Sequence, residues 1–117
     1  MYTALLLLFA AVNFTGAWKL NEKASGTTAG GPHEIVWKIE QSETKFKYSA
    51  TGKRGYMPFS EAYELPTVWD GDALVLKYVK DGREFARFTL RMSADGKQMT
   101  REGTVGSTRI REIYDRQ

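Results

Sequence analysis

Polar and apolar residues alternate along most of this chain, beginning with the stretch from Phe14 to Leu20. Within that stretch the even positions hold Phe14, Trp18 and Leu20, and the odd positions hold Thr15 and Lys19. Side chains two residues apart point to the same face of a β-strand, so this period of two predicts a half-buried first strand. Trp18, the largest of these side chains, belongs to the buried face.

Two more strands are predicted between residues 34 and 50, with a turn at residues 41–43. The inward face of this hairpin is apolar: Ile35, Trp37, Ile39, Phe46, Tyr48 and Ala50. The opposite face is polar and largely basic, with Lys38, Lys45 and Lys47. One apolar face and one charged face are typical of an antiparallel sheet that covers a core on one side.

The pattern is less regular between a turn at residues 51–55 and an Asp-Gly turn at residues 70–71. Pro58 and Pro66 restrict strand pairing here, because proline has no backbone N–H to donate. We therefore expect only an edge strand or a short strand, near residues 59–63.

The last third of the chain predicts a meander. The apolar faces of its first two strands are Leu74, Leu76 and Tyr78, and then Ala86, Phe88, Leu90 and Met92. A three-residue turn at residues 80–82 would place Leu76 opposite Ala86. A two-residue turn would instead set Leu76 beside Arg87, so the apolar pattern favours the three-residue turn.

A tight turn at Gly106-Ser107 joins the last two predicted strands and pairs Arg101 with Glu112. The same face of this hairpin carries Met99, Ile110 and Tyr114. Because that face is largely apolar, we expect Arg101 and Glu112 to lie opposite each other inside the fold. A lone buried charge is costly, and an opposed pair reduces that cost.

Residues 21–33 interrupt the strands. Their Gly, Thr and Ser content and their lack of apolar periodicity predict a loop and not a helix. A loop of this length either acts as a lid over the end of the domain or merely connects two strands. The sequence leaves both alternatives open.

The chain therefore predicts eight or nine short antiparallel strands in a single all-β domain, residues 13–117. Strands that follow one another in space as in sequence, each polar outside and apolar inside, fit an up-and-down barrel that closes on itself. A two-sheet sandwich is the alternative, but it usually needs longer crossover connections than this meander provides.

Residues 1–12 differ from the rest in composition. Residues 4–12 are uninterrupted apolar sequence, too short to span a bilayer but of the length found in a signal peptide. No Lys or Arg precedes this run, so we interpret it as a truncated signal peptide of a secreted or periplasmic protein. A buried first strand or an N-terminal helix lying on the barrel is the alternative.

Composition removes several classes of function. The chain has no Cys and a single His, which argues against disulfides and against metal sites built on thiolate or imidazole. Its net charge is +3, but the Lys and Arg residues are scattered, as on a solvated outer face. We therefore expect no nucleic-acid partner and no stable membrane insertion, while the oligomeric state stays open.

Catalytic motifs are missing from the sequence. His33 lies in the Gly-rich loop with no partner suggested by spacing, and Asp70 and Asp72 have the pattern of a turn. No Gly-rich phosphate loop follows a strand and opens a helix. We expect neither a cofactor nor enzymatic activity.

The residues quoted so far resemble a known superfamily. Phe14-Thr-Gly-Ala-Trp-Lys-Leu20 resembles the opening strand of the calycins, which include lipocalins and intracellular fatty-acid-binding proteins, and residues 110–117 resemble the closing strand of the latter. Residues 69–76, 93–96 and 114–117 are similar to small secreted bacterial lipocalin-like proteins of unassigned function. The similarity covers the two ends and the final third of the chain.

This resemblance implies a lipocalin-like barrel that binds a small hydrophobic or amphipathic molecule. It also implies that an Arg near the last strand stacks over Trp18 and helps to close the barrel; among Arg109, Arg111 and Arg116, we choose Arg116. In the fatty-acid-binding branch an Arg near the closing Tyr binds the ligand carboxylate, but Glu112 occupies that position here.

We therefore expect a ligand cavity inside the barrel, with Arg101 and Glu112 as a polar anchor for a ligand head group. The residues expected to line it are Trp37, Ile39, Phe46, Tyr48, Leu76, Tyr78, Phe88, Leu90, Met99, Arg101, Glu112 and Tyr114. For Arg101 and Glu112 the alternative is a structural ion pair. For the whole protein it is a barrel filled by its own side chains, which acts as a structural or protein-interaction module without a ligand.

Overall fold

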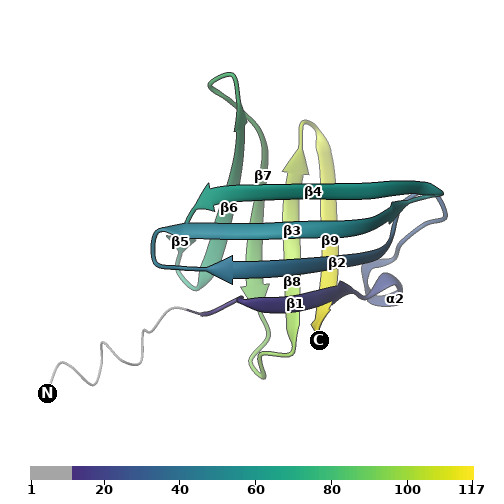
Figure 1. Cartoon of the computed structure of the whole chain (residues 1–117), viewed down its shortest axis with the longest axis horizontal. Helices are drawn as coiled ribbons and strands as arrows, with labels where there is room; N and C mark the ends of the chain where they lie inside the picture. The colour runs from purple at the N-terminus through teal and green to yellow at the C-terminus, as the bar shows by residue number, and fades with distance from the viewer. Residues whose placement is uncertain (1–11) are drawn as a thin grey trace, which may run out of the picture.

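Residues 12–117 form a single nine-stranded antiparallel sheet in the computed structural model (Figure 1). The strands are β1 (Gly16–Leu20), β2 (Pro32–Gln41), β3 (Lys45–Arg54), β4 (Met57–Pro66), β5 (Val68–Asp70), β6 (Ala73–Lys80), β7 (Arg83–Met92), β8 (Gln98–Val105) and β9 (Thr108–Arg116). One short helix, α2 (Glu22–Ser25), lies between β1 and β2. The model describes residues 12–117, so the predicted signal segment falls outside it, apart from Val12.

Neighbours in the sheet are neighbours in sequence, apart from the pairing of β1 with β9. The order β4-β3-β2-β1-β9-β8-β7-β6-β5 is that of an up-and-down meander whose first strand returns to its last. Figure 1 shows β1–β4 running crosswise over β6–β9, so that the curled sheet forms two layers that face each other. The predicted all-β, antiparallel, barrel-like fold is thus confirmed.

The ring is incomplete, because β4 and β5 are the two ends of the sheet and do not pair with each other. The expectation that the barrel closes on itself and removes its edges is therefore wrong. The sheet curls into a half-barrel, and the packed side chains of its inner face hold the two layers together.

Helix α2 corrects the prediction that residues 21–33 form only a loop. Capping residues stabilise both ends of its single turn. The side chain of Asn21 accepts a hydrogen bond from the Ala24 N–H, and Gly26 adopts a left-handed conformation with φ of 69°. These are the residue types that favour helix N- and C-termini. Four residues are too few for apolar periodicity to show, so only the capping residues could have indicated this turn.

Strand β4 is twice as long as predicted, although its place at the edge of the sheet is as expected. It pairs with β3 over its whole length, from Met57 opposite Arg54 to Pro66 opposite Lys45. Pro58 lies near one end of the strand and Pro66 forms the other. Because an edge strand needs backbone donors on one side only, prolines are compatible with it.

The β6–β7 hairpin corrects the predicted three-residue turn. Lys80 pairs with Arg83 across a two-residue turn in which Asp81 and Gly82 both have positive φ, 52° and 74°. The register then shifts at Phe85, so that Leu76 lies opposite Phe88 and not opposite Ala86. The bulge returns every apolar side chain to the inner face, which is why the pattern predicted the correct face but the wrong partners.

The β8–β9 hairpin has the predicted register. Arg101 pairs with Glu112, and Met99 pairs with Tyr114. On the other side of β8, Gly103 pairs with Phe88 of β7, and a Cβ on Gly103 would lie 1.9 Å from the Arg87 carbonyl oxygen. Only glycine fits where the two backbones approach so closely.

Candidate functional site

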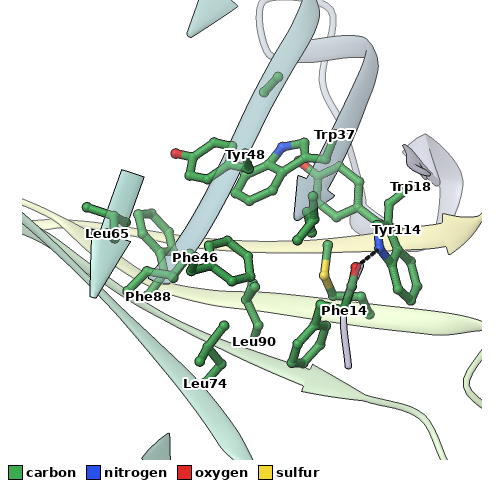
Figure 2. Packing of buried hydrophobic residues seen from close by; sticks show 14 of the residues in the cluster. Phe14, Trp18, Trp37, Phe46, Tyr48, Leu65, Leu74, Phe88, Leu90 and Tyr114 are labelled. Carbon is green, nitrogen blue, oxygen red and sulfur yellow. Dashed lines mark hydrogen bonds between the residues drawn. The ribbon is translucent and has the colours of Figure 1, made fainter. Parts of the chain in front are cut away.

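The side chains expected to line a ligand cavity pack together in the buried core. The apolar residues expected to line it are at most 4% exposed: Trp37, Ile39, Phe46, Tyr48, Leu76, Tyr78, Phe88, Leu90 and Met99. Figure 2 shows the labelled side chains of both layers pointing toward one another, with Phe14 and Leu74 among them. The Trp37 and Tyr48 rings are stacked, with centroids 4.0 Å apart.

At one end of this core the predicted ion pair is present. The Arg101 Nη1 donates to Glu112 Oε1 over 2.9 Å, and the Tyr114 hydroxyl donates to the same oxygen over 2.9 Å. Both charged side chains are 12% exposed. The structure therefore places Arg101 and Glu112, the predicted polar anchor, in contact with each other and with Tyr114.

Aromatic rings surround the guanidinium of Arg101. Its Cζ lies 3.6 Å from the centroid of Phe88 and 5.2 Å from that of Trp37, within the range of cation–π attraction. Burial disfavours the charge, but Glu112 and the nearby tyrosines more than offset burial and raise the pKa of Arg101. Arg101 is therefore a cation at neutral pH.

Tyr48 and Tyr78 form a second polar group beside the pair. Their hydroxyls lie 2.5 Å apart, and the Tyr48 hydroxyl also donates to Glu61 Oε2 over 2.9 Å. Burial raises the pKa of both phenols, and for Tyr48 the neighbouring Tyr78 raises the pKa further. Both side chains are therefore neutral hydrogen-bonding groups and not sources of a phenolate nucleophile.

A small void adjoins Arg101, Glu112 and Tyr114. Its volume is about 20 Å³, which is room for one water molecule. Its lining is mostly polar or aromatic: Pro32, Ile35, Trp37, Arg54, Phe59, Glu61, Arg101, Glu112 and Tyr114. Among the described residues, the buried Arg101 Nε has no hydrogen-bond partner, and a void of this size has room for one water that accepts a hydrogen bond from it.

Sequence analysis missed two charged residues at this void, Glu61 and Arg54. Glu61 has the parity of Phe59 and Tyr63, so alternation through β4 would have placed it on the inner face. The prolines obscured that strand. Arg54 lies at the end of β3, where its guanidinium is 4.7 Å from the centroid of Phe59.

A much larger concavity lies elsewhere, on the outer face of β1–β4. This open groove has a volume of about 730 Å³, and the small outward-facing residues Ala17, Ser49 and Ala62 form its floor. Lys38, Glu40, Lys47 and Glu64 contribute the outward-facing walls. Arg101 and Glu112 do not line this groove, whereas Ile39 and Tyr48, which were expected to line an internal cavity, are among its lining residues.

The predicted barrel-closing residues lie together at the joint between β1 and β9. The Arg116 Cζ is 4.2 Å from the centroid of the Trp18 ring, and Trp18 is fully buried with its Nε1 donating to the Phe14 carbonyl oxygen. The same guanidinium donates to the carbonyl oxygens of Gly96 and Thr15, over 2.9 and 3.1 Å. Arg116 thus ties β1 to the loop before β8.

His33 has a partner that its sequence position did not suggest. Its Nδ1 lies 2.6 Å from Glu22 Oε1, and its Nε2 lies 3.2 Å from the Ala29 carbonyl oxygen. Because both ring nitrogens face acceptors, the arrangement is complete only in the doubly protonated imidazolium. The hydrogen bond to Glu22 raises the pKa of His33, and the same bond lowers the pKa of Glu22.

Metal sites and membrane-spanning helices were also sought among the described residues. Residues 12–117 contain no cluster of three or more His, Cys, Asp or Glu side chains placed to hold a metal ion. Across the same part of the chain, no helix is long and apolar enough to cross a membrane. In comparisons with known proteins, no family model and no curated protein matches this sequence.

Proposed function

We propose that this protein is a half-barrel filled by its own side chains, which acts through its outer surfaces as a non-enzymatic interaction module. This is the alternative that the sequence left beside an internal ligand cavity. The observation that supports it is the size of the interior void, about 20 Å³, which holds a water molecule and not an acyl chain or an aromatic ligand.

The polar cluster supports the same proposal. Glu112 already accepts hydrogen bonds from Arg101 and Tyr114, and the Tyr48 hydroxyl is already engaged with Tyr78 and Glu61. A ligand head group would have to break these bonds inside a packed core. The cluster has the composition of a satisfied structural network, with one orphan N–H and a water-sized space beside it.

The unpaired edge of strand β4 is a candidate binding site for a partner protein. Strand β4 runs for ten residues along the open edge of the sheet and includes Tyr63, which is 37% exposed. An unpaired edge presents backbone groups to an added strand, as in many peptide-recognition domains. Pro58 and Pro66 limit that addition to the middle of the strand.

Titration of the folded protein with cis-parinaric acid and with anilinonaphthalene sulfonate tests the proposal. We expect no saturable binding to wild type. The variant Leu90→Ala removes part of a fully buried side chain, at a cost of about 2–5 kcal/mol, and leaves an apolar cavity. We therefore expect Leu90→Ala, or Met99→Ala if the first does not fold, to gain binding of a small apolar molecule such as benzene.

Saturable binding of cis-parinaric acid to wild type that Leu90→Phe abolishes would show an internal ligand site and refute the proposal. Native mass spectrometry of protein purified from its source provides a second readout. A co-purified small molecule that is retained in the folded protein would contradict a filled interior. We expect the mass of the chain alone.

A second candidate function has its own observation, the outer groove of about 730 Å³. An amphipathic molecule could lie on its small-residue floor with an anionic head group at Lys38 or Lys47. In this case Ala62→Phe should weaken binding of an anionic amphiphile such as dodecyl phosphate, while Ser60→Phe should not. Ser60 is exposed on the same face of β4 but does not line the groove, so it is the matched control.

A further inference from the structure

The tips of two hairpins carry exposed apolar side chains at adjoining positions. Val79 and Phe85 at the β6–β7 tip are 60% and 41% exposed, and Val105 at the β8–β9 tip is 40% exposed. The two tips are joined: the Gly106 N–H donates to the Phe85 carbonyl oxygen over 3.0 Å, and Ala86 pairs with Val105. Figure 1 shows both hairpins extending past the edge strand β4 at the top of the view.

Basic residues surround these apolar side chains. Lys80 and Arg83 form the closing pair of the β6–β7 turn, and Arg109 lies near the start of β9. In residues 12–117 none of these three cations takes part in an ion pair, whereas Glu84 at the same tip is bound to Arg87. Asp81 offsets one charge, and the two tips keep a net positive charge.

The apolar side chains lie on both faces of the protruding strands. Val105 and Phe85 lie toward the inner side, where Val105 has the parity of Arg101 and the Phe85 ring centroid is 6.1 Å from that of Tyr78. Val79 follows the inward-facing Tyr78 and points outward. A protein partner docked on one face would leave the other apolar side chain in water. A medium that surrounds the tips covers all three.

From this arrangement we infer that the β6–β7 and β8–β9 tips dock into the interfacial region of an anionic lipid bilayer. Val79, Phe85 and Val105 enter the boundary between head groups and acyl chains, while Lys80, Arg83 and Arg109 contact anionic head groups. Basic residues around a small apolar surface are the composition of reversible peripheral binding, not of insertion across the membrane. This inference is independent of what fills the barrel.

Co-sedimentation of the full chain with vesicles of phosphatidylcholine, with and without phosphatidylserine, tests the inference. We expect binding to the vesicles that contain phosphatidylserine and loss of that binding as salt is raised, because exposed charges are screened. Removing the cations in Lys80→Gln/Arg83→Gln/Arg109→Gln should lower the partition coefficient about fivefold per cation. Val79→Ser/Phe85→Ser/Val105→Ser should lower it about tenfold or more, even at low salt.

The matched control is Tyr56→Ser/Met57→Ser at the tip of the β3–β4 hairpin. Tyr56 and Met57 are more exposed, at 99% and 70%, but belong to another tip. We expect this variant to bind like wild type. Every variant retains residues 1–12, so any contribution of that apolar segment is the same in each comparison.

A second measurement detects contact with lipid directly and does not depend on a variant losing vesicle binding. In Val105→Trp, brominated phospholipids should quench the added indole in anionic vesicles and leave Tyr56→Trp unquenched. The inference is overturned if phosphatidylserine adds nothing to binding, if the control loses as much affinity as the tip variants, or if Val105→Trp is not quenched. Concentration-dependent dimerisation that Phe85→Ser abolishes, without vesicle binding, would assign the tips to a second copy of the chain instead.

Discussion

The buried pair of Arg101 and Glu112 allows a quantitative test of how the polar end of the core is held. In Arg101→Met, Glu112 keeps only the Tyr114 hydroxyl as a partner while remaining 12% exposed. In Glu112→Leu, the guanidinium keeps only its aromatic neighbours, and the Tyr114 hydroxyl loses its acceptor. Each change leaves an uncompensated buried charge, which costs about 3–5 kcal/mol of unfolding free energy.

The double variant Arg101→Met/Glu112→Leu removes both charges. The methionine side chain can follow the path of the arginine stem between Phe88 and Trp37, and one lost hydrogen bond to Tyr114 costs about 1 kcal/mol. Replacing a buried pair by apolar residues of similar size is often neutral. We therefore expect the double variant to lose no more than about 2 kcal/mol, which gives a coupling energy above about 3 kcal/mol.

Equilibrium unfolding in urea at pH 7, followed by tryptophan emission, measures all four stabilities. The control cycle is Lys45→Met/Glu64→Leu, a cross-strand pair at 3.2 Å on the outer face with side chains 66% and 50% exposed. Its coupling should be below about 1 kcal/mol, since exposed pairs are hydrated and screened. Additivity within about 0.5 kcal/mol at Arg101 and Glu112 would refute the reasoning.

Four further outcomes follow from particular contacts. Gly103→Ala should destabilise by about 1–3 kcal/mol or more in urea unfolding, because its Cβ meets the backbone of β7, whereas Gly30→Ala, with open space around it, should not. The hydrogen bond to Glu22 raises the pKa of His33, so the stabilisation from this pair is complete below the ordinary pKa of 6.5 and is lost as pH rises through the folded value. When the free energy of unfolding is measured against pH, this dependence should be missing in His33→Gln. Tyr48→Phe should leave the amplitude of the ultraviolet tyrosine titration near pH 10 unchanged, because burial raises the pKa of that phenol, and a smaller amplitude would contradict this. Arg116→Ala should lower the midpoint of thermal unfolding by an amount that corresponds to about 1–2 kcal/mol, and an unchanged midpoint would show that its contacts are energetically neutral.

Alternation of apolar residues predicted correctly which side chains lie on the inner face of the sheet, but it predicted less well which residues pair across neighbouring strands. Parity placed Leu76 and Phe88 on the inner face, but the bulge at Phe85 set the register between them. A bulge depends on the twist of two strands and on turn geometry, which apolar pattern does not encode. The two-residue Asp81-Gly82 turn was readable, since Asp-Gly is a strong signal for this hairpin type.

The polar end of the core was predictable in part. Gly106 fixed the β8–β9 register, and so the contact of Arg101 with Glu112 followed from the sequence. Glu61 and Arg54 did not follow, because β2–β4 and β8–β9 meet only after the sheet curls. Whether the interior is filled was also out of reach, since it depends on whether side chains of two layers interdigitate, and composition does not determine that.

Stability alone does not require the ion pair, since replacing a buried pair by apolar residues of similar size is often neutral. On the inner face of the β8–β9 hairpin, a shift of two positions would keep every inward-facing side chain on that face. Such a shift would place Arg101 opposite Ile110 or Tyr114 and separate it from Glu112. It would bury two uncompensated charges, at a cost of about 3–5 kcal/mol each. The pair therefore supports the register that the Gly106-Ser107 turn sets and that alternation alone does not specify. We expect the double variant to populate a second register, visible as doubled amide resonances for β8 and β9.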